Sequence, residues 1–338
     1  MLPMVVGCDI GYGNLKVVYG RRGEPPVERV LPSGAGPVAM APRTTSGEIN
    51  LLKGHLVNVR GESWVAGVQG TQLQGYSRVL HANYPETDHY WSLYMAALLE
   101  TKSDYIDVLV TGLPVYQFTQ QPELKQRLKE RLAGTHQPVG DRKIHVETVL
   151  IREQPLGAYF DAWYVNQAKM KELEKAHILV VDAGFYSVDY VVLYMGDVFH
   201  HYSSSSTLAT GDILERAASK MASTHAATIT KDMLEAALRE GRNTIMVYSQ
   251  EEPFMTYVES AARQVGKQVA DEILNTLRTS QFNIGCVIMT GGAANLYASS
   301  LQAAFPKAFQ YSSHSPVAAN ARGFHRMGLR QAAKAAQK

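Results

Sequence analysis

The chain has 338 residues, more than one hydrophobic core usually supports, so its length predicts two domains. Hydrophobic residues make up 46% of the sequence and charged residues 19%, which is typical of a soluble globular protein with enough apolar material for two cores. The net charge of +2 argues neither for a nucleic-acid binder nor against an acidic partner, and the sequence has no apolar run long enough to span a membrane.

The two cysteines, Cys8 and Cys286, argue against two classes of site. Each falls inside an apolar, strand-like run, and neither belongs to a Cys-x-x-Cys pair or to a Cys and His cluster. Zinc and redox sites are therefore not expected. The start of the chain also lacks the pattern of a secretory signal, so we expect a reducing, cytoplasmic location.

Residues 5–19 predict the first element, a β-hairpin. An apolar strand ends in Asp9, a turn contains Gly11 and Gly13, and a second strand carries Lys16. A carboxylate at the end of a buried strand can hold the water shell of Mg²⁺, and glycines allow positive φ and a close approach of backbone N–H groups to phosphate. The alternative is an ordinary hairpin, because Asp and Gly also favour turns.

The next stretch predicts strands and helices up to the middle of the chain. A strand at 27–31 is broken by the Pro- and Gly-rich residues 32–37. The pattern of apolar residues then predicts a sheet-rich insertion at about 36–80, a helix at 86–101, a buried strand at 105–112, a surface helix at 122–133, a strand through Val149 and Ile151, and a helix at about 156–176.

Residues 178–192 repeat the hairpin pattern at half-chain separation. An apolar strand ends in Asp182, the turn contains Gly184, and the hydroxyls of Tyr186 and Ser187 follow. These groups are candidates for the far side of a bound phosphate. A second copy of the pattern weakens the ordinary-hairpin alternative, because a single short motif has a high false-positive risk.

The remaining sequence predicts a mainly helical region followed by one more strand and a last helix. A Gly-rich turn at 291–295 follows that strand. The predicted elements are a strand at 198–202, a Ser-rich loop at 203–211, helices at 212–223, 230–240 and 254–279, a strand at 284–290, and a helix from about Val317.

Five ordered segments together resemble the nucleotide signature of the actin, Hsp70 and sugar-kinase superfamily. They are Asp9 to Lys16, Glu153 ahead of a helix, Asp182-Ala183-Gly184, Gly291-Gly292-Ala293 and Ala321-Arg322-Gly323. The short length and the stretches Leu31-Pro32-Ser33 and Asn320-Ala321-Arg322-Gly323 resemble the plasmid-segregation actins of the ParM/StbA type.

The resemblance implies an α/β, actin-like (ribonuclease H-like) duplicated two-domain fold with a central nucleotide cleft. Domain I would comprise residues 1–160 and 318–338, with the insertion at about 36–80 as subdomain IB. Domain II would comprise 161–317, with a helical subdomain IIB at about 212–280.

The same resemblance assigns catalytic and metal roles. The cofactors would be Mg²⁺ and ATP, with GTP as the alternative nucleotide, and Asp9 and Asp182 would hold the metal through its waters. Lys16 with the Gly11 and Gly13 amides would hold the phosphates, and Glu153 would polarise the attacking water. Gln154 is the competing candidate for orienting that water. An alternative reading of Glu153 is a cap for the helix that begins near Pro155.

Further nucleotide contacts are expected at the strand-to-helix turn and at the start of the helix near residue 212. Amides at a helix N-terminus suit phosphates or a sugar edge. Glu215 is a candidate for the ribose hydroxyls, with a solvated first-turn acid as the alternative. The other expected contacts are Tyr12, Asn14, Gly184, Phe185, Tyr186, Gly211, Asp212, Gly291, Gly292, Ala293 and Asn295. Phe185 departs from the family pattern, which has Gly there, and puts a bulky ring beside the phosphates.

The implied function is a bacterial actin-like ATPase that polymerises into filaments for plasmid DNA segregation. Its partners would be further copies of itself and an adaptor protein bound to centromere-like DNA. We expect neither a membrane partner nor direct sequence-specific nucleic-acid binding. Two alternatives of the same superfamily remain, a small-molecule kinase and a nucleotide-gated scaffold that barely hydrolyses ATP.

Overall fold

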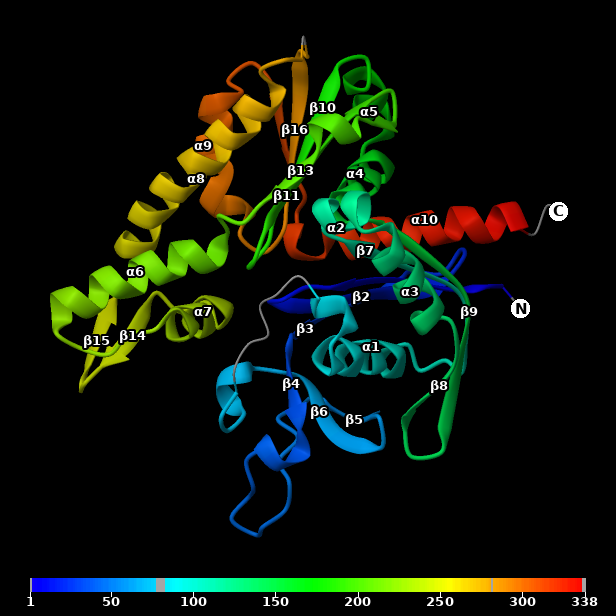
Figure 1. Cartoon of the computed structure of the whole chain (residues 1–338), viewed down its shortest axis with the longest axis vertical. Helices are drawn as coiled ribbons and strands as arrows, with labels where there is room; N and C mark the ends of the chain where they lie inside the picture. The colour runs from blue at the N-terminus through cyan, green and yellow to red at the C-terminus, as the bar shows by residue number, and fades with distance from the viewer. Residues whose placement is uncertain (1, 77–82, 281, 336–338) are drawn as a thin grey trace. The chain divides into compact units, whose positions relative to one another are not determined.

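The computed structural model describes residues 2–76, 83–280 and 282–335 (Figure 1). The chain forms two compact units, each with its own sheet. Unit 1 comprises Met1–Glu172 and Ser312–Lys338, and unit 2 comprises Leu173–Tyr311. The first boundary therefore lies at Glu172, whereas the sequence placed it at 160, and the second lies at Ser312, whereas the sequence placed it at 318.

Unit 1 is built on a six-stranded sheet in the order β3-β2-β1-β7-β9-β8. Its strands are β1 (Met4–Ile10), β2 (Asn14–Arg21), β3 (Val27–Pro32), β7 (Tyr105–Leu113), β8 (Gly134–Val139) and β9 (Arg142–Glu153). The first three strands are antiparallel neighbours, whereas β7 runs parallel to both β1 and β9. Parallel neighbours need a crossover, and α1 (Asp88–Glu100) lies in the connection from β1 to β7.

Helices cover both faces of this sheet (Figure 1). Val6, Cys8 and Ile10 of β1 share a core with α1, whereas Val5 packs with Phe324 of α10 (Ala319–Ala335). This is the alternation expected of a strand buried on both sides. A Cβ at Gly7 would lie 2.1 Å from the Ala321 carbonyl oxygen, so β1 and α10 touch backbone to backbone.

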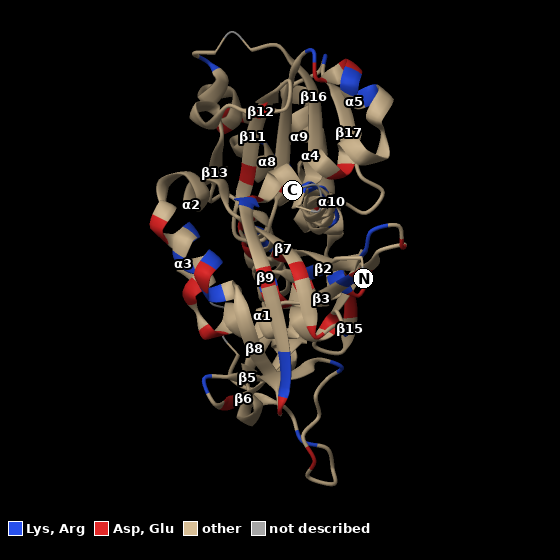
Figure 2. Cartoon of the chain, turned by 90° about the vertical axis from the view of Figure 1, so that its right-hand side faces the viewer, with Lys and Arg blue, Asp and Glu red and all other residues tan. Residues whose placement is uncertain are grey.

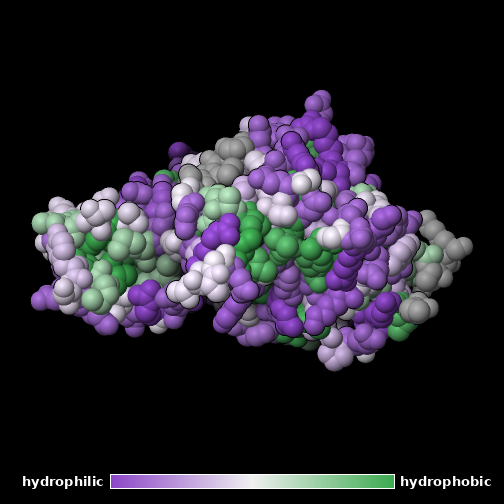
Figure 3. All heavy atoms as spheres, turned by 90° about the horizontal axis from the view of Figure 1, so that it is seen from below, coloured by the Kyte–Doolittle hydropathy of each residue, from purple (hydrophilic) through white to green (hydrophobic). Residues whose placement is uncertain are grey.

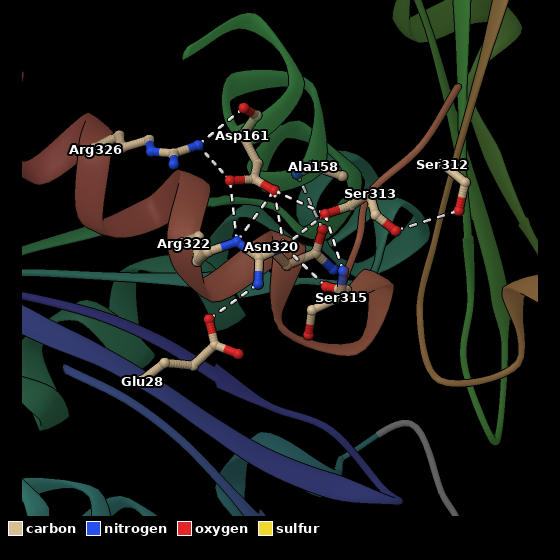
Figure 4. Close-up of polar contacts among 9 residues, drawn as sticks. All are labelled: Glu28, Ala158, Asp161, Ser312, Ser313, Ser315, Asn320, Arg322 and Arg326. Carbon is tan, nitrogen blue, oxygen red and sulfur yellow. Dashed lines mark hydrogen bonds and ion pairs between the residues drawn. The ribbon is translucent and has the colours of Figure 1, made fainter. Parts of the chain in front are cut away.

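An ionic cluster joins α10 to α4 (Gln154–Val165) (Figure 4). Asp161 is buried and pairs with both Arg322 and Arg326, and the Arg322 Nη2–Asp161 Oδ2 distance is 2.9 Å. Arg322 also contacts Glu28 of β3 at 2.9 Å and donates to the Ser315 carbonyl at 2.8 Å. Because α4 is tied to α10 in this way, it belongs to unit 1, which explains the later boundary.

Two shorter helices and a small sheet complete unit 1. The helices are α2 (Val115–Gln120) and α3 (Pro122–Leu132), and α3 is a surface helix as expected, with both signs of charge along it (Figure 2). Strands β4 (Gly34–Pro37), β5 (His55–Val59) and β6 (Glu62–Val68) pair in the order β4-β6-β5. The predicted insertion is therefore sheet-rich, although its residues 77–80 lie outside the described ranges. Residues 34–37, expected only to break a strand, form one themselves.

Unit 2 has a sheet in the order β12-β11-β10-β16-β17, with β13 also paired to β11. Its strands are β10 (His177–Ala183), β11 (Val188–Tyr194), β12 (Asp197–Val198), β13 (Ser204–Ser206), β16 (Ile284–Thr290) and β17 (Phe309–Ser312), and β14 (Thr244–Val247) and β15 (Gln250–Pro253) form a separate hairpin. Its helices are α6 (Thr210–His225), α7 (Lys231–Arg239), α8 (Met255–Leu277) and α9 (Ala294–Ala304). Both units thus place an antiparallel hairpin beside a parallel strand, which confirms the duplicated actin-like α/β fold.

Three predicted elements differ in the structure. The helix expected at 156–176 is divided at Asn166 into α4 and α5 (Gln167–Leu173), because Asn166 leaves the helical conformation at φ −138°. The strand expected at 198–202 ends at Val198, and a 3₁₀ turn follows at His200–Tyr202. Part of the expected loop at 203–211 is strand β13, because Ser204–Ser206 pairs with β11. Within the described part of the chain, none of the helices is both long and apolar enough to cross a bilayer.

Candidate functional site

Three predicted site residues, Asp9, Lys16 and Gln154, meet near the end of β1. Asp9 is 2% exposed, and the strand register places Lys16 directly opposite it. Lys16 Nζ lies 3.0 Å from Asp9 Oδ2, and Gln154 Nε2 donates to Asp9 Oδ1 at 3.0 Å. A buried carboxylate is stable only when it is paired and hydrogen-bonded, and this one has a partner on each oxygen.

The turn of this hairpin uses glycine for space. The Gly11 amide donates to the Asn14 carbonyl at 3.0 Å, so it is engaged inside the turn. A Cβ at Gly11 would lie 3.0 Å from Lys16 Nζ, and its φ is outside the left-handed region. Gly11 therefore leaves room for the Lys16 side chain. It does not supply the positive φ that the sequence suggested.

The side chain of Tyr12 packs within unit 1. Its ring stacks on Tyr84 with centroids 4.3 Å apart, beside the core that includes α1. A nucleotide contact from Tyr12 would therefore come from its backbone. Cys8, one residue before Asp9, has a fully buried thiol whose pKa is raised first by burial and then by the Asp9 charge, so it stays protonated and unreactive.

Glu153 and Gln154 lie where β9 meets α4. Glu153 is 3% exposed and occupies the N-cap position of α4, but its side chain makes no capping hydrogen bond, and Pro155 lies in the first turn of the helix. The capping alternative for Glu153 thus lacks the hydrogen bond it needs. Of these two neighbours, Gln154 is the one bound to Asp9.

The second hairpin repeats the backbone of the first with different side chains. Asp182 is the second-last residue of β10, and the Gly184 amide donates to the Ser187 carbonyl at 3.0 Å. The residue opposite Asp182 in the register is Asp189, which is 2% exposed. Asp189 accepts a hydrogen bond from Ser187 Oγ at 2.7 Å and another from Ser205 Oγ.

The turn between β16 and α9 lies against Asp182. Gly291 has φ +91°, and a Cβ there would lie 2.6 Å from Asp182 Oδ1 and 2.3 Å from the Ala183 carbonyl oxygen. The Ala293 amide donates to the same carbonyl at 3.3 Å. Only glycine fits this close approach. Gly292 and Asn295 belong to the same turn and the start of α9.

Phe185 is half-buried and packs against the core of unit 2. Its carbonyl accepts from the Gly211 amide at 2.9 Å, and a Cβ at Gly211 would lie 3.4 Å from the Phe185 ring. The preceding Gly184 carbonyl accepts from Thr210 Oγ1 at 2.6 Å. The bulky side chain is therefore accommodated between the hairpin and the start of α6.

Three other predicted residues of unit 2 have different surroundings. Asp212 caps its own helix, because its Oδ2 accepts from the Ala209 amide at 2.9 Å. Glu215 is largely exposed and forms an ion pair of 3.0 Å with Lys231. Tyr186 is half-buried in the turn. For these residues the nucleotide contacts remain predictions.

Each hairpin places one buried carboxylate near a strand end, a type of ligand that Mg²⁺ prefers. Among the described residues, no three His, Cys, Asp or Glu side chains come together as a metal cluster. Mg²⁺ usually keeps several waters and binds proteins through one or two carboxylates. Asp9 and Asp182 are each buried near a strand end, each within its own unit.

Sequence reasoning missed three polar residues that organise these turns. Ser33 contacts the first turn, Thr210 contacts the second, and Asp189 faces Asp182. Asp189 had a usable signal, since it follows Asp182 at the spacing that separates Asp9 from Lys16. The contacts of Ser33 and Thr210 depend on how distant strands and helices pack, which no local spacing reveals.

Comparison with known proteins agrees with this duplicated architecture. Residues 7–157 match the family described as "Actin like proteins N terminal domain", and residues 180–303 match "Archaeal actin homologue MreB-like, C-terminal". No curated protein sequence matches the chain.

Several solved structures share the fold. The archaeal actin homologue Ta0583 superposes with a TM-score of 0.75 at 19% identity, covering 98% of this chain and 100% of its own. Its complex with ADP gives 0.74 at 18%, with coverage of 98% and 100%. A 15-stranded ParM filament from Clostridium botulinum gives 0.74 at 17%, also with coverage of 98% and 100%. The chain belongs to the actin-like proteins, with a match in each of its two units.

Proposed function

We propose that this actin-like chain binds ATP with Mg²⁺, hydrolyses it, and polymerises into filaments that segregate plasmid DNA in the cytoplasm. The observation that carries the nucleotide part is the Asp9, Lys16 and Gln154 cluster at the end of β1. An ordinary hairpin needs no buried ion pair beside its turn. The ADP complex of the similar archaeal actin homologue supports the choice of ligand.

In this proposal each side chain has a distinct task. Lys16 donates to the phosphates, and Asp9 and Asp182 hold the waters of the metal. The metal, when bound, neutralises charge on the triphosphate. Glu153 accepts the proton of the attacking water. Gln154 is a positioning residue, because its amide nitrogen already donates to Asp9.

The assembly part of the proposal rests on resemblance and on exposed apolar surface. Similar structures include a ParM filament and an Alp12 filament. In unit 1 the insertion exposes Ile49, Leu51 and Leu56, and apolar areas are visible on the face seen in Figure 3. Such surface commonly marks protein contacts. We further propose that an adaptor protein links the filament to centromere-like DNA.

The test is a Glu153→Ala variant. We expect turnover to fall by roughly 10²- to 10⁴-fold, since that is the usual contribution of a general base. ATP-dependent assembly, followed by light scattering, should persist because Asp9 and Lys16 are intact. Glu123→Ala, a change at an exposed acid of α3, is the matched control and should leave both unchanged.

Two outcomes would contradict the proposal. Unchanged phosphate release from Glu153→Ala would remove the role of Glu153. A wild-type chain that stays monomeric at high concentration with every nucleotide would remove the filament. Turnover measured without any added acceptor separates this ATPase from a small-molecule kinase.

A further inference from the structure

The turn that follows Asp9 is held from behind by a serine on another strand. Ser33 directly follows β3, is 2% exposed, and contacts the turn twice. Its Oγ donates to the Tyr12 carbonyl, and its amide donates to the Gly13 carbonyl at 3.1 Å. Both consecutive carbonyls of the turn are therefore directed toward Ser33.

This arrangement also sets the direction of two amides. In a trans peptide the C=O and the following N–H point in opposite directions. Because the Tyr12 and Gly13 carbonyls point to Ser33, the Gly13 and Asn14 N–H groups point to the other side of the turn. The Gly13 and Asn14 amides are therefore the ones whose direction Ser33 sets, whereas the Gly11 amide donates to the Asn14 carbonyl.

Ser33 is itself fixed by a histidine on α1. His89 is 6% exposed, and its Nε2 lies 2.6 Å from the Ser33 carbonyl oxygen. A carbonyl only accepts, so Nε2 carries the hydrogen. The ring is packed beside Tyr84, with centroids 5.7 Å apart. After Ser33, a Cβ at Gly34 would lie 2.2 Å from the Val68 carbonyl oxygen, so this segment has little freedom to move.

We propose that Ser33 and His89 are positioning residues that hold the Gly13 and Asn14 amides in the orientation that binds phosphate. The inference rests on the proposed nucleotide-binding function and deepens it. Unit 2 offers a parallel, because Thr210 Oγ1 donates to the Gly184 carbonyl of the second turn at 2.6 Å. In both units a hydroxyl from a distant element fixes a carbonyl of the turn.

The first experiment compares Ser33→Ala with Ser92→Ala. Ser92 is also buried, but its hydroxyl donates to the His89 carbonyl within α1 and does not reach the turn. The readouts are hydrogen exchange of the amides of residues 12–14 without nucleotide, the Kd for Mg·ADP, and the Tm. We expect Ser33→Ala to raise exchange and weaken ADP binding by about tenfold each, the effect of losing one hydrogen bond.

Ser92→Ala should lower the Tm and leave the other two readouts unchanged. The proposal is overturned if Ser33→Ala matches Ser92→Ala in exchange and in ADP affinity. A wild-type protein that binds neither ADP nor ATP overturns the proposed function instead, and that result is distinct because it precedes any variant.

The second experiment separates the histidine's hydrogen bond from its packing. His89→Gln keeps an N–H near the position of Nε2, whereas His89→Phe keeps a ring and removes the donor. We expect His89→Gln to stay within about threefold of wild type and His89→Phe to resemble Ser33→Ala. Equal losses in both variants would overturn the role of His89. If Ser33→Ala does not fold, this pair decides the proposal by the same readouts.

Discussion

The Asp9 hairpin and the Asp182 hairpin have the same backbone and opposite electrostatics. In each, an Asp is the second-last residue of the first strand and an amide-to-carbonyl bond of 3.0 Å closes the turn. The residue opposite the Asp is Lys16 in the first hairpin and Asp189 in the second. The two hairpins therefore share the backbone that positions Asp9 and Asp182, and they differ in the side chains opposite them.

The divergence shows how each hairpin satisfies its buried carboxylates within its own unit. Asp9 is neutralised by Lys16 and oriented by Gln154. Asp189, in contrast, is held by serine hydroxyls and faces another carboxylate across the strands. Under the proposed function, the first hairpin would supply Lys16 to the phosphates in addition to the metal role of Asp9, and the second would supply only carboxylate charge for the hydrated metal.

The packing behind the hairpins differs as well. Two residues before Asp9 is Gly7, where β1 meets the α10 backbone, and two residues before Asp182 is the fully buried Val180. Gly7→Ala would place a methyl group 2.1 Å from the Ala321 carbonyl oxygen and 2.3 Å from the backbone nitrogen of His325. We expect a loss of at least about 3 kcal/mol in the free energy of unfolding, because backbone must separate.

Val180→Ala is the matched variant, and it should cost about 2 kcal/mol through lost burial and a small cavity. Urea unfolding followed by circular dichroism measures both. A Gly7→Ala protein more stable than Val180→Ala would show that α10 and β1 adjust freely.

The next largest effect is expected from changing the residue opposite the Asp in each hairpin, Lys16 or Asp189. Lys16→Met should weaken Mg·ATP binding about hundredfold, equivalent to about 2.7 kcal/mol, because a charge-assisted hydrogen bond is lost. Asp189→Asn should change the affinity much less. Isothermal titration measures both, with Lys129→Met on α3 as the exposed control. Equal losses of Mg·ATP affinity in Lys16→Met and Asp189→Asn would contradict the different roles of the two hairpins.

Lowering the pH should lower the stability of the packing between α10 and the first hairpin. The group responsible is His325, whose backbone contacts Gly7. Burial lowers the pKa of His325 from 6.5 to about 4, with Arg326 acting in the same direction and the hydrogen bond to Gly20 opposing it. Between those values the unfolded chain binds a proton that the folded chain excludes, so stability falls as the pH falls.

From pH 7 to pH 5 this should remove about 2 kcal/mol from the free energy of unfolding. Urea midpoints at the two pH values measure it. His325→Gln should abolish that part of the pH dependence, whereas His200→Gln, at an exposed residue, should retain it. A wild-type midpoint that does not shift would contradict the assignment.

The smallest expected effect is that of Phe185→Gly, which restores the glycine typical of the family. The Phe185 ring packs on the core, and its backbone carbonyl keeps its bond to Gly211 in either form. Turnover should therefore change by less than about threefold, or about 0.7 kcal/mol. Phosphate-release kinetics measure it, and a tenfold change would show that the ring controls the chemistry.

The parts of the site that could be predicted are those encoded locally. Turn length sets the register of a hairpin, so Asp9 opposite Lys16 followed from their spacing. The hydrogen bond from Gln154 to Asp9 joins residues far apart in the sequence. It depends on the sheet order, in which β7 lies between β1 and β9.

The incorrect predictions have similar causes. Residues 34–37 and 204–206 are poor strand formers, yet each pairs with a neighbouring strand, because tertiary packing overrides weak propensity. The division at Asn166 was hidden because the good helix formers at residues 167–170 continue the helical pattern after it.

The close contact between α10 and β1 has a consequence for biosynthesis. Unit 2 is one continuous stretch, whereas α10 is made after every other element of unit 1. The strand that carries Asp9 emerges early from the ribosome but lacks its covering helix until then. Because domains tend to fold as units during synthesis, we expect unit 2 to become protease-resistant first and the Asp9 hairpin last, when residues 319–335 arrive.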